Sequence, residues 1–305
     1  MIPPMAVDLS IVVVHWNVPE LLAACLTSID SECKRTDLVV ETFVVDNASP
    51  DSAFRCVVDA VRGAELIELE ENRGYAAGCN AGITRARGDA ILLLNPDTEL
   101  RPGALDVLWQ ALHISAHIGL VAPLLLNPDG SVQSAGYSFP GVANVLFDLM
   151  PLHPRLYESP LNGRMPVSDG VQPMKIDYPL GAAMLLRRAA LDDVGPLDES
   201  YGMYSEEVDW ARRLANGGWT ALLAPSARVV HRGGQSTGQR PEAMYEALWT
   251  SRAMYYRRYA TVWQRRVIRG LVSVGTRWED RRASPQRRAT NARIRSRFAD
   301  LGSRT

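Results

Sequence analysis

An Asn-Pro-Asp triplet at residues 95–97 directly follows a run of five apolar residues, Ala90 to Leu94. A carboxylate placed directly after a buried strand lies at the sheet edge where ligands bind, and there Asp97 could hold a divalent metal ion against a diphosphate. The same aspartate could instead cap a helix that begins near Pro102. The triplet alone therefore leaves a metal ligand and a helix cap as alternatives.

A second aspartate, Asp46, follows a pair of valines in the same way. Its carboxylate could accept hydrogen bonds from a nucleobase imide or from ribose hydroxyls. The next residues, Asn47 to Ser49, also make a good helix entry, so a purely structural role stays open.

Residues 71–82, with the sequence ENRGYAAGCNAG, are rich in small side chains. Small residues let a backbone approach a ligand closely, and a helix that begins there favours a phosphate at its N-terminus. The spacing matches neither a P-loop nor a GxGxxG motif after the first strand. The segment therefore indicates either a ligand contact or close packing of a helix on a sheet.

Three carboxylates, Glu206, Glu207 and Asp209, fall within four residues. Repulsion between them could raise one pKa toward that of a general base, and the group could also bind a metal. The alternative is a first helical turn, where the helix dipole favours negative charge.

His231 ends an apolar run that starts at Ala221, and the polar residues 232–237 follow it. A single histidine more often has a structural role than a ligand role. If it shares a sheet edge with Asp97, it could supply a second metal ligand or a contact to a diphosphate.

These residues need a scaffold, and the first hundred residues alternate strand and helix patterns. Strands are predicted at residues 9–15, 39–45, 64–69 and 90–94, with helices between them. This alternation with short loops predicts right-handed crossovers and a mostly parallel α/β sheet. The carboxyl ends of the strands then share one edge, which gathers four polar residues: Asn17, Asp46, Asn72 and Asp97.

The rest of the chain has a less regular pattern. Residues 127–179 predict loops and short elements rather than a separate domain. A strand is predicted at residues 181–187, a helix at 206–216 with Ser205 as its cap and Gly217-Gly218 at its end, and a strand at 219–230. From about Pro241 onward the pattern is helical and rich in arginine. We expect one α/β domain over residues 1–240 and a basic helical extension over residues 241–305.

Seven segments in this order resemble the family 2 glycosyltransferases, and in particular their bacterial rhamnosyltransferase-like branch. The resemblance covers about residues 8–240 and implies the GT-A fold. It implies that residues 1–240 are the catalytic domain, with a donor half at about 8–100 and an acceptor half at about 101–240. The segments are SIVVVHWN (10–17), VVDNASPD (44–51), ENRGYAAGCNAG (71–82), LLLNPDTEL (92–100), LGAAMLLRRAAL (180–191), VGPLDESYGMYSEEVDWARRLANGGW (194–219) and VVHRGGQSTG (229–238).

The resemblance assigns roles on the donor side. In that family the aspartate that matches Asp46 contacts the nucleobase, and the segment that matches Asn72 and Gly74 lines the donor pocket. Residues 95–97 match the metal-binding DxD motif, which implies Asp97 as the main metal ligand. This chain departs from the motif because Asn95 replaces its first acid.

The resemblance also assigns roles on the acceptor side. The family's catalytic base is the aspartate of a Glu-Asp pair, and Glu207 stands at that position with a side chain longer by one methylene. Because of this departure, Glu206 and Asp209 stay open as alternatives. The segment that begins at Gly181 matches a region near the acceptor, and His231 matches a position near the metal or the diphosphate.

The implied reaction is an inverting, metal-dependent transfer of a sugar, with rhamnose as a candidate, from a dTDP- or UDP-linked donor. The implied cofactor is Mg²⁺ or Mn²⁺, and the acceptor is an oligosaccharide or a polyprenyl-diphosphate-linked saccharide in cell-wall or surface polysaccharide synthesis. Two alternatives stay open. One is a sugar-phosphate nucleotidyltransferase, although residues 10–19 lack the Gly-rich basic signature of that class. The other is a non-catalytic membrane-bound scaffold with a degenerate donor site.

The net charge of −1 conceals an uneven distribution. Residues 252–304 carry 15 arginines and three acidic residues, a balance of +12, which leaves −13 on the remainder. Arginine interleaved with Trp and Tyr in helices predicts peripheral contact with an anionic membrane. The alternatives are a solvated helix packed on the catalytic domain and, ranked last, binding of nucleic acid.

Composition bounds the protein class and its location. With 47% hydrophobic and 22% charged residues, the chain is neither a disordered protein nor a small disulfide scaffold. Its four cysteines lack metal-ligand spacing, the first eight residues lack a basic secretory segment, and no apolar run approaches ~18 residues. We expect a cytoplasmic protein, peripheral at the inner face of the cell membrane.

Overall fold

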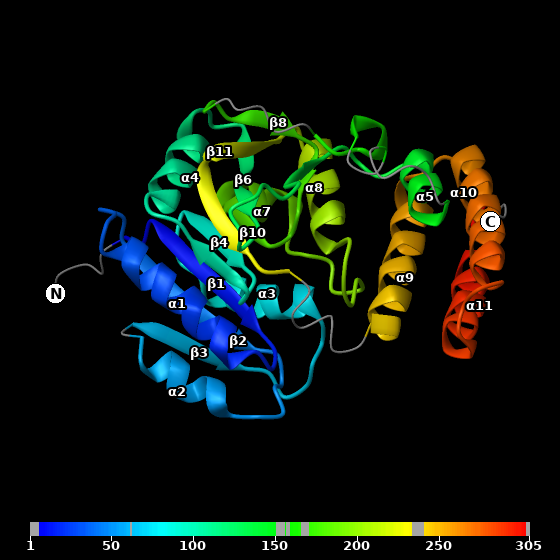
Figure 1. Ribbon diagram of the computed structural model, residues 1–305. Coiled ribbons are helices and arrows are strands. Elements are labelled where there is room, and N and C mark those ends of the chain that lie inside the picture. Colours follow the sequence, from blue (N-terminus) through cyan, green and yellow to red (C-terminus); the bar gives the residue numbers. More distant parts are fainter. Residues whose placement is uncertain are drawn as a thin grey trace.

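The structure is a computed structural model that describes residues 6–61, 63–150, 156, 159–165, 171–233 and 241–302. Its centre is a nine-stranded sheet with the strand order β3-β2-β1-β4-β10-β6-β11-β5, in which β8 pairs with β11 (Figure 1). The strands of this sheet are β1 (Leu9–His15), β2 (Val40–Asp46), β3 (Ala64–Glu68), β4 (Ala90–Leu94), β5 (Thr98–Leu100), β6 (Ile118–Leu126), β8 (Met174–Ile176), β10 (Ala183–Arg187) and β11 (Thr220–His231).

The N-terminal half of the sheet is parallel and the C-terminal half is mixed. β1 pairs in parallel with β2 and β4, and β2 pairs in parallel with β3, as the alternating strand and helix pattern predicts. β10 runs antiparallel between β4 and β6, whereas β6 and β11 are parallel to each other. The predicted α/β class with a mostly parallel sheet is therefore confirmed, with an antiparallel strand at its centre.

Helices connect and cover these strands. They are α1 (Pro19–Cys33), α2 (Ala53–Asp59), α3 (Tyr75–Arg85), α4 (Ala104–His113), α7 (Arg188–Val194) and α8 (Glu206–Asn216). The small residues of α3 let it pack closely on β1, because a Cβ on Gly78 or Gly82 would come within 2.6 Å of Val14 or 2.3 Å of Val12. Part of the small-residue pattern thus reflects helix–sheet packing, the alternative that the sequence left open.

The described residues between 127 and 179 form short elements joined by loops, as predicted. They are β7 (Gly136–Tyr137), α5 (Val142–Leu149), a single 3₁₀ turn (Pro160–Asn162), β8 and β9 (Tyr178–Pro179). β7 and β9 pair with each other in a second, two-stranded sheet.

One predicted local feature is wrong. Helix α8 has the predicted bounds, but the Ser205 side chain makes no capping hydrogen bond. Ser205 has a φ of 67°, and Tyr204 before it a φ of 68°, so both lie in the left-handed region rather than in the extended conformation of an N-cap. The helix start is therefore set by the shape of the preceding loop.

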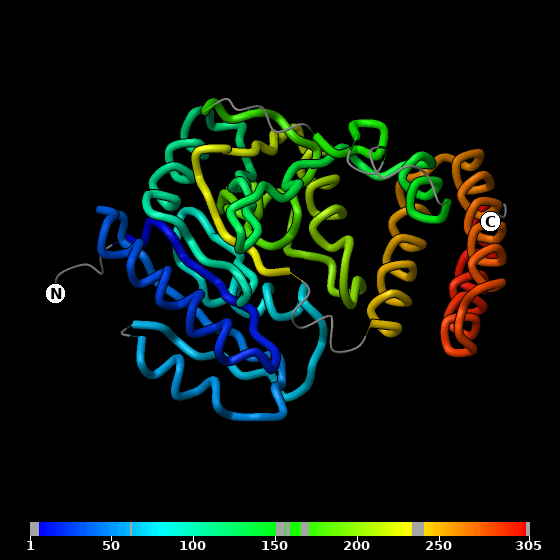
Figure 2. The backbone as a smooth tube through the Cα atoms, viewed as in Figure 1, coloured from blue at the N-terminus to red at the C-terminus, as the bar shows by residue number. Residues whose placement is uncertain are grey.

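The C-terminal extension consists of α9 (Pro241–Tyr259), α10 (Val262–Glu279) and α11 (Pro285–Ala299). The extension packs against the body that contains the sheet. Trp249 and Ile268 of the extension share a second hydrophobic core with Val145 of α5 and with Tyr201 and Val208 in and just before α8. Figures 1 and 2 show α9 between the body that contains the sheet and the pair α10–α11. The predicted boundary at residue 240 lies outside the described residues.

In the described part of the chain, no helix has the length and apolar composition needed to cross a bilayer.

Candidate active site

Asp97 and His231 lie side by side at the end of the sheet. β5 and β11 are antiparallel with His231 opposite Thr98, and this register brings Asp97 Oδ1 to 3.6 Å from His231 Nε2. Both side chains are largely buried, and the Arg232 N–H donates to the Asp97 carbonyl oxygen at 3.0 Å. The structure therefore brings together the two residues expected as metal ligands. The remainder of that segment, residues 234–238, lies outside the described residues.

Gln133 orients the imidazole of His231. The Gln133 amide nitrogen donates to the His231 carbonyl oxygen at 2.7 Å and to Asn127 Oδ1 at 2.6 Å, so its Oε1 faces His231 Nδ1 at 3.0 Å. Because an amide oxygen only accepts, Nδ1 carries the proton and the Nε2 lone pair faces Asp97. Burial also lowers the pKa of His231 and raises that of Asp97.

This arrangement fits a divalent cation. A neutral imidazole lone pair and a carboxylate oxygen that face each other form no hydrogen bond, yet both are donors for a metal ion. The described residues contain no group of three or more His, Cys, Asp and Glu that could hold a metal by themselves. Asp97 and His231 suit an ion that takes its other ligands from a diphosphate and from water.

The loops after β1 and β2 meet through Ser49. The backbone N–H of Asn17 donates to Ser49 Oγ at 2.8 Å, and the backbone N–H of Ser49 donates to the Asp46 carboxylate at 3.0 Å. Asn17 and Asp46, both predicted at the donor side, therefore belong to one hydrogen-bonded unit. In the sequence, Ser49 is one of several polar loop residues, and no signal distinguishes it as the link between the two loops.

His15 is a polar residue that sequence reasoning missed. It ends β1 opposite Asp46 in the register of β1 and β2, and its ring lies 5.3 Å from that of Phe54. Burial lowers the pKa of His15 to about 4, so the ring is neutral. Neither ring nitrogen has a hydrogen-bond partner among the described residues. The available signal was a polar residue that directly follows four buried apolar residues of β1, residues 11–14.

Asn47 joins the second loop to the segment at residues 72–74. Its amide nitrogen donates to the Gly74 carbonyl oxygen at 3.0 Å, and its Oδ1 accepts from the Arg73 N–H at 3.1 Å. Asn72 shapes the same turn, since its Oδ1 accepts from the Gly74 N–H at 3.1 Å. The predicted donor residues Asp46, Asn72 and Gly74 are thus held in adjoining loops, with Asn47 as the unpredicted link.

The donor-side loop also touches the loop before α8. Gly74 has a φ of +87°, and a Cβ at this position would lie 2.0 Å from the carbonyl oxygen of Gly202. Only glycine allows so close an approach in this conformation. The Tyr75 hydroxyl then donates to the Gly181 carbonyl oxygen at 3.2 Å, on the acceptor side.

Glu206 and Glu207 begin α8 in different environments. Glu206 is 5% exposed, and one of its carboxylate oxygens has no hydrogen-bond partner among the described residues. Burial, with a contribution from the charge of Glu207, raises the pKa of Glu206 well above its usual range. Glu207 is half-buried, and burial raises its pKa to about 7. The pair thus offers one carboxyl that stays protonated and one that titrates near neutrality.

Gly181 packs against Glu207. A Cβ at Gly181 would lie 3.4 Å from Glu207 Cγ, so the glutamate side chain lies along this backbone. The next residue, Ala182, accepts a hydrogen bond of 2.9 Å from the Asn95 backbone N–H. Residues 181–182 therefore form a short bridge between Glu207 and the Asn-Pro-Asp segment.

Asp209 differs from Glu206 and Glu207 because it is fully buried and both of its carboxylate oxygens accept hydrogen bonds. Its carboxylate pairs with Arg213 at 2.9 Å and with Arg258 at 2.7 Å, and it accepts from the Tyr259 and Tyr201 hydroxyls at 2.8 and 3.3 Å. These contacts connect α8 to α9 through Asp209, and both of its carboxylate oxygens have protein partners.

Residues with a strained backbone lie in the loops that carry the candidate site. Among the described residues, four that are not glycine have positive φ: Asn17, Ala48, Tyr204 and Ser205. All four lie in the loops after β1, after β2 and before α8. Strained backbone tends to persist at functional sites, where the surrounding structure over-determines it.

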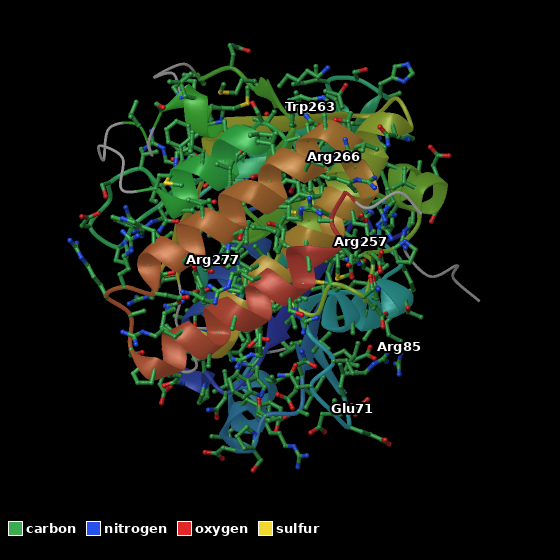
Figure 3. The ribbon with its side chains drawn as sticks, turned by 90° about the vertical axis from the view of Figure 1, so that its right-hand side faces the viewer. Glu71, Arg85, Arg257, Trp263, Arg266 and Arg277 are labelled. Carbon is green, nitrogen blue, oxygen red and sulfur yellow. The ribbon has the colours of Figure 1, made fainter. Side chains whose placement is uncertain are left out.

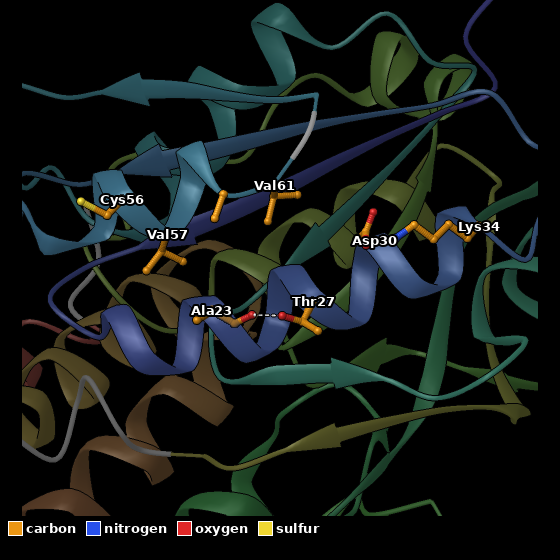
Figure 4. Close-up of a pocket in the computed structure, with 8 residues that line it drawn as sticks. Ala23, Thr27, Asp30, Lys34, Cys56, Val57 and Val61 are labelled. Carbon is orange, nitrogen blue, oxygen red and sulfur yellow. Dashed lines mark hydrogen bonds and ion pairs between the residues drawn. The ribbon is translucent and has the colours of Figure 1, made fainter.

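A separate groove of about 530 Å³ lies between α1 and α2, lined by residues that include Thr27, Asp30, Lys34 and Cys56 (Figure 4). Lys34 and Asp30 pair with each other there at 2.5 Å. None of the predicted site residues lines this groove, so it is not part of the candidate site.

Two curated proteins are similar to the chain along most of its length. It is 29% identical, over 77% of its length and 80% of the other protein, to the N-acetylglucosaminyl-diphospho-decaprenol L-rhamnosyltransferase of Mycobacterium tuberculosis. It is 28% identical to a low-salt glycan biosynthesis hexosyltransferase of Haloferax volcanii, over 68% of the chain and 61% of that protein.

Solved structures support the GT-A fold. GalNAc-T7, crystallised with UDP, GalNAc and Mn²⁺, has a TM-score of 0.57 at 13% identity and covers 97% of this chain, which spans 56% of that one. S. aureus TarS residues 1–349 have a TM-score of 0.50 at 14% identity, with 96% and 71% covered. Residues 10–195 match Glycosyl transferase family 2. The chain therefore belongs to Glycosyl transferase family 2 and is a glycosyltransferase.

Proposed function

We propose that this glycosyltransferase moves L-rhamnose, with inversion at the anomeric carbon, from a dTDP- or UDP-linked donor to a polyprenyl-diphosphate-linked saccharide. The similarity to a decaprenol-linked L-rhamnosyltransferase supports the choice of sugar and acceptor. A role in cell-wall or surface polysaccharide synthesis follows from that acceptor class.

Glu207 is the proposed base. In a single displacement the acceptor hydroxyl oxygen attacks the anomeric carbon, the bond from that carbon to the diphosphate oxygen breaks, and the hydroxyl proton passes to the base. With a pKa of about 7, Glu207 is both ionised in a useful fraction near neutral pH and basic enough to take that proton. Glu206 is assigned a supporting role, because its buried carboxyl stays protonated.

Asp97 and His231 would hold a divalent metal ion on the side of the departing diphosphate. Such an ion, Mg²⁺ or Mn²⁺, would neutralise the charge that develops there. His231 keeps its Nε2 lone pair free because Gln133 accepts from Nδ1. Asn17, Asp46, Asn72 and Gly74 are proposed to hold the nucleoside part of the donor, and Asn95 and Gly181 to line the space between the two halves.

The observation that carries this proposal is the backbone bridge at residues 181–182. It packs against Glu207 on one side and accepts from Asn95, two residues before Asp97, on the other. This bridge supports the pairing of a proposed base with a proposed metal-binding carboxylate on neighbouring segments. A single inverting displacement needs a base on one side and leaving-group stabilisation on the other.

The test is transfer from dTDP-L-rhamnose, and separately from UDP-sugars, to a polyprenyl-diphosphate-linked N-acetylglucosamine in the presence of Mg²⁺ or Mn²⁺. We expect release of nucleoside diphosphate in step with a mass increase of one deoxyhexose on the acceptor, and an inverted anomeric configuration by NMR. Release of diphosphate without a glycosylated acceptor, or retention of configuration, would contradict the proposal.

Asp97→Asn tests the metal side separately. We expect at least about a hundredfold loss of transfer and a loss of the thermal stabilisation that Mn²⁺ adds to bound nucleoside diphosphate. Asp37→Asn is the matched control, since Asp37 is an exposed carboxylate that precedes β2, whereas Asp46 of the candidate site ends that strand. Equal Mn²⁺ dependence in both variants would refute the assignment of Asp97.

We further propose that the protein works peripherally at the inner face of the cell membrane and contacts it through the C-terminal extension. An acceptor attached to a polyprenyl chain is confined to the bilayer, so an enzyme held at that surface meets it more often. The surplus of arginine in residues 252–304 supports this location.

A further inference from the structure

Helix α10 has one buried face that fixes its orientation. Ile268, Val272 and Thr276 are fully buried, and Gly275 lies so close to α5 that a Cβ on it would be 2.7 Å from Leu149 Cβ. The helix therefore cannot rotate about its axis without loss of this packing. The opposite face always points away from the protein.

That outward face carries an exposed apolar stripe. Trp263, Val267, Val274 and Trp278 are exposed by 61, 41, 60 and 41% respectively. Their spacings of four, seven and four residues align them on one side of the helix. At ~1.5 Å per residue the stripe is about 22 Å long, with a tryptophan at each end. We call these four residues the α10 stripe.

Arginines border the α10 stripe without carboxylate partners. Helical geometry places Arg266 and Arg277 along one edge, and the Arg282 guanidinium lies 6.0 Å from the centre of the Trp278 ring. No ion pair joins any of these three to a carboxylate within the described residues. Figure 3 shows α10 and α11 facing outward, with Trp263, Arg266 and Arg277 labelled.

Several arginines of α9 and α11 differ from these three because they form ion pairs with carboxylates. Five of them pair with carboxylates at 2.6 to 3.3 Å: Arg252 with Asp148, Arg258 with Asp209, Arg287 with Glu242, Arg293 with Glu246 and Arg295 with Asp280. Arg257 of α9 and Arg288 of α11 also lack a carboxylate partner among the described residues, but most of the arginines without one lie on α10 and the turn that follows it.

Three kinds of partner could cover the α10 stripe and its arginines, and the chemistry of this face favours one of them. A second copy of the chain would bring the same arginines against one another. A nucleic acid would use the arginines but leave the valines of the stripe in water. An anionic lipid surface satisfies both, because indole rings and aliphatic side chains enter the interface while guanidinium groups remain at the phosphates.

We infer that the α10 stripe, with Arg266, Arg277 and Arg282, is the surface on which this protein docks to an anionic lipid bilayer. This inference deepens the proposed membrane location and rests on it, since it names the helix face and the lipid charge. Helices α9 and α11 contribute Trp249, Tyr256, Ile294 and Phe298 to the second hydrophobic core and so are structural parts of the extension.

The test is co-sedimentation of the full chain with phosphatidylcholine vesicles that contain or lack phosphatidylglycerol. We expect binding that requires the anionic lipid and weakens with salt. Trp263→Ser with Trp278→Ser should lower the partition coefficient at least about tenfold. Arg266→Glu with Arg277→Glu should lower it by about fivefold or more for each arginine.

The matched control is Ile114→Ser with Lys175→Glu. Ile114 is 63% exposed and Lys175 is an exposed cation of β8, so the pair removes the same kinds of groups from other elements. This variant should bind vesicles as the unmodified chain does. Because all substituted side chains are exposed, each variant should keep the melting temperature, which circular dichroism checks.

Three outcomes would overturn the inference. They are equal vesicle binding by both α10 variants and the unmodified chain, a lipid-free dimer that these variants dissociate, and oligonucleotide binding that they abolish while vesicle binding persists. Vesicle binding is measured without donor or acceptor. A failure here is therefore distinct from a failure of sugar transfer, which is assayed separately.

Discussion

At the scale of single residues, two adjacent glutamates differ because of their surroundings. Glu206 is enclosed and has an unpaired oxygen, whereas Glu207 is half-buried against Gly181. Burial disfavours the charged form of both, but the second charge in a close pair is harder to form than the first. Glu207 therefore titrates first and Glu206 stays neutral, which gives the two residues different proposed roles.

The pH dependence of transfer tests this assignment. A general base works only when deprotonated, so kcat/KM should rise with pH to a plateau, with a midpoint of about 7 set by Glu207. Glu207→Gln should lower kcat about 10²- to 10⁴-fold and remove that limb of the profile. Glu65→Gln, at an exposed ion pair with Arg85, is the control that should leave both unchanged. A midpoint near 4 in the unmodified enzyme would contradict the role of Glu207.

At the scale of elements, the site depends on contacts between loops that belong to different strands and helices. The Gly74 loop after β3 touches Gly202 before α8, and Asn47 after β2 holds the Gly74 loop from the other side. Each loop is short and begins at a strand or helix end, so its position follows from the sheet.

Gly74→Ala should separate these loops. The new Cβ would meet the Gly202 carbonyl oxygen at a φ of +87°, which combines a clash with backbone strain. Gly63→Ala has the same φ of +87° and no atom within 4 Å, so it reproduces the strain alone. We expect both variants to lose about 1 kcal/mol of stability from the strain. Only Gly74→Ala should weaken binding of the nucleoside diphosphate, as measured by calorimetry.

Arg258→Met tests the joint between α8 and α9. Arg258 pairs with Asp209 and Asp198, and Asp209 would keep Arg213 and Tyr259 as partners. Because Arg258 is itself half-exposed, we expect a loss of about 1–3 kcal/mol in the free energy of unfolding. The neighbouring Arg257 is exposed and forms no ion pair with the described residues, so Arg257→Met is the control, which should change stability by less than about 0.5 kcal/mol. Equal effects in denaturant unfolding would contradict a joint at Asp209.

At the scale of the whole molecule, the catalytic domain and its extension depend on each other. Tyr201 and Val208, which flank the Glu206–Glu207 pair, are buried in the core that α9, α10 and α11 complete. Ser251 of α9 also donates to the Met203 carbonyl oxygen at 2.7 Å, in the loop before α8. The extension therefore supports the loop that begins α8 as well as carrying the α10 stripe.

Truncation to residues 1–240 should expose this core. Tyr201 and Val208 would enter water, and Asp209 would lose Arg258 and Tyr259, so we expect a loss of more than about 3 kcal/mol in the free energy of unfolding. Thermal unfolding followed by near-ultraviolet circular dichroism measures it. A truncated chain as stable as the full one would show that the two cores are independent. Surface substitutions on α10 are consequently the better test of membrane docking.

Much of the architecture could be predicted because its signals are local. The apolar runs of β1 and β4, the helical pattern of α8 and the change to arginine-rich helices after Pro241 each lie within one stretch of sequence. The site residues Asp46 and Asp97 were found because a polar residue after a buried strand is a local signal as well. Ser205 was misassigned as a side-chain cap because its left-handed conformation is imposed by the loop rather than by its residue type.

The sequence by itself determined the α/β class, the sheet edge that carries the acidic residues, the family and the charge division between residues 252–304 and the remainder. The tertiary structure decided which groups meet, because those contacts join residues far apart in the chain. It alone placed Gln133 on His231, Asn47 on Gly74 and Gly181 on Glu207, and it alone showed which arginines pair with carboxylates. Residue type and spacing set what each group can do, whereas burial and neighbours across the fold set its protonation, its partners and its exposure.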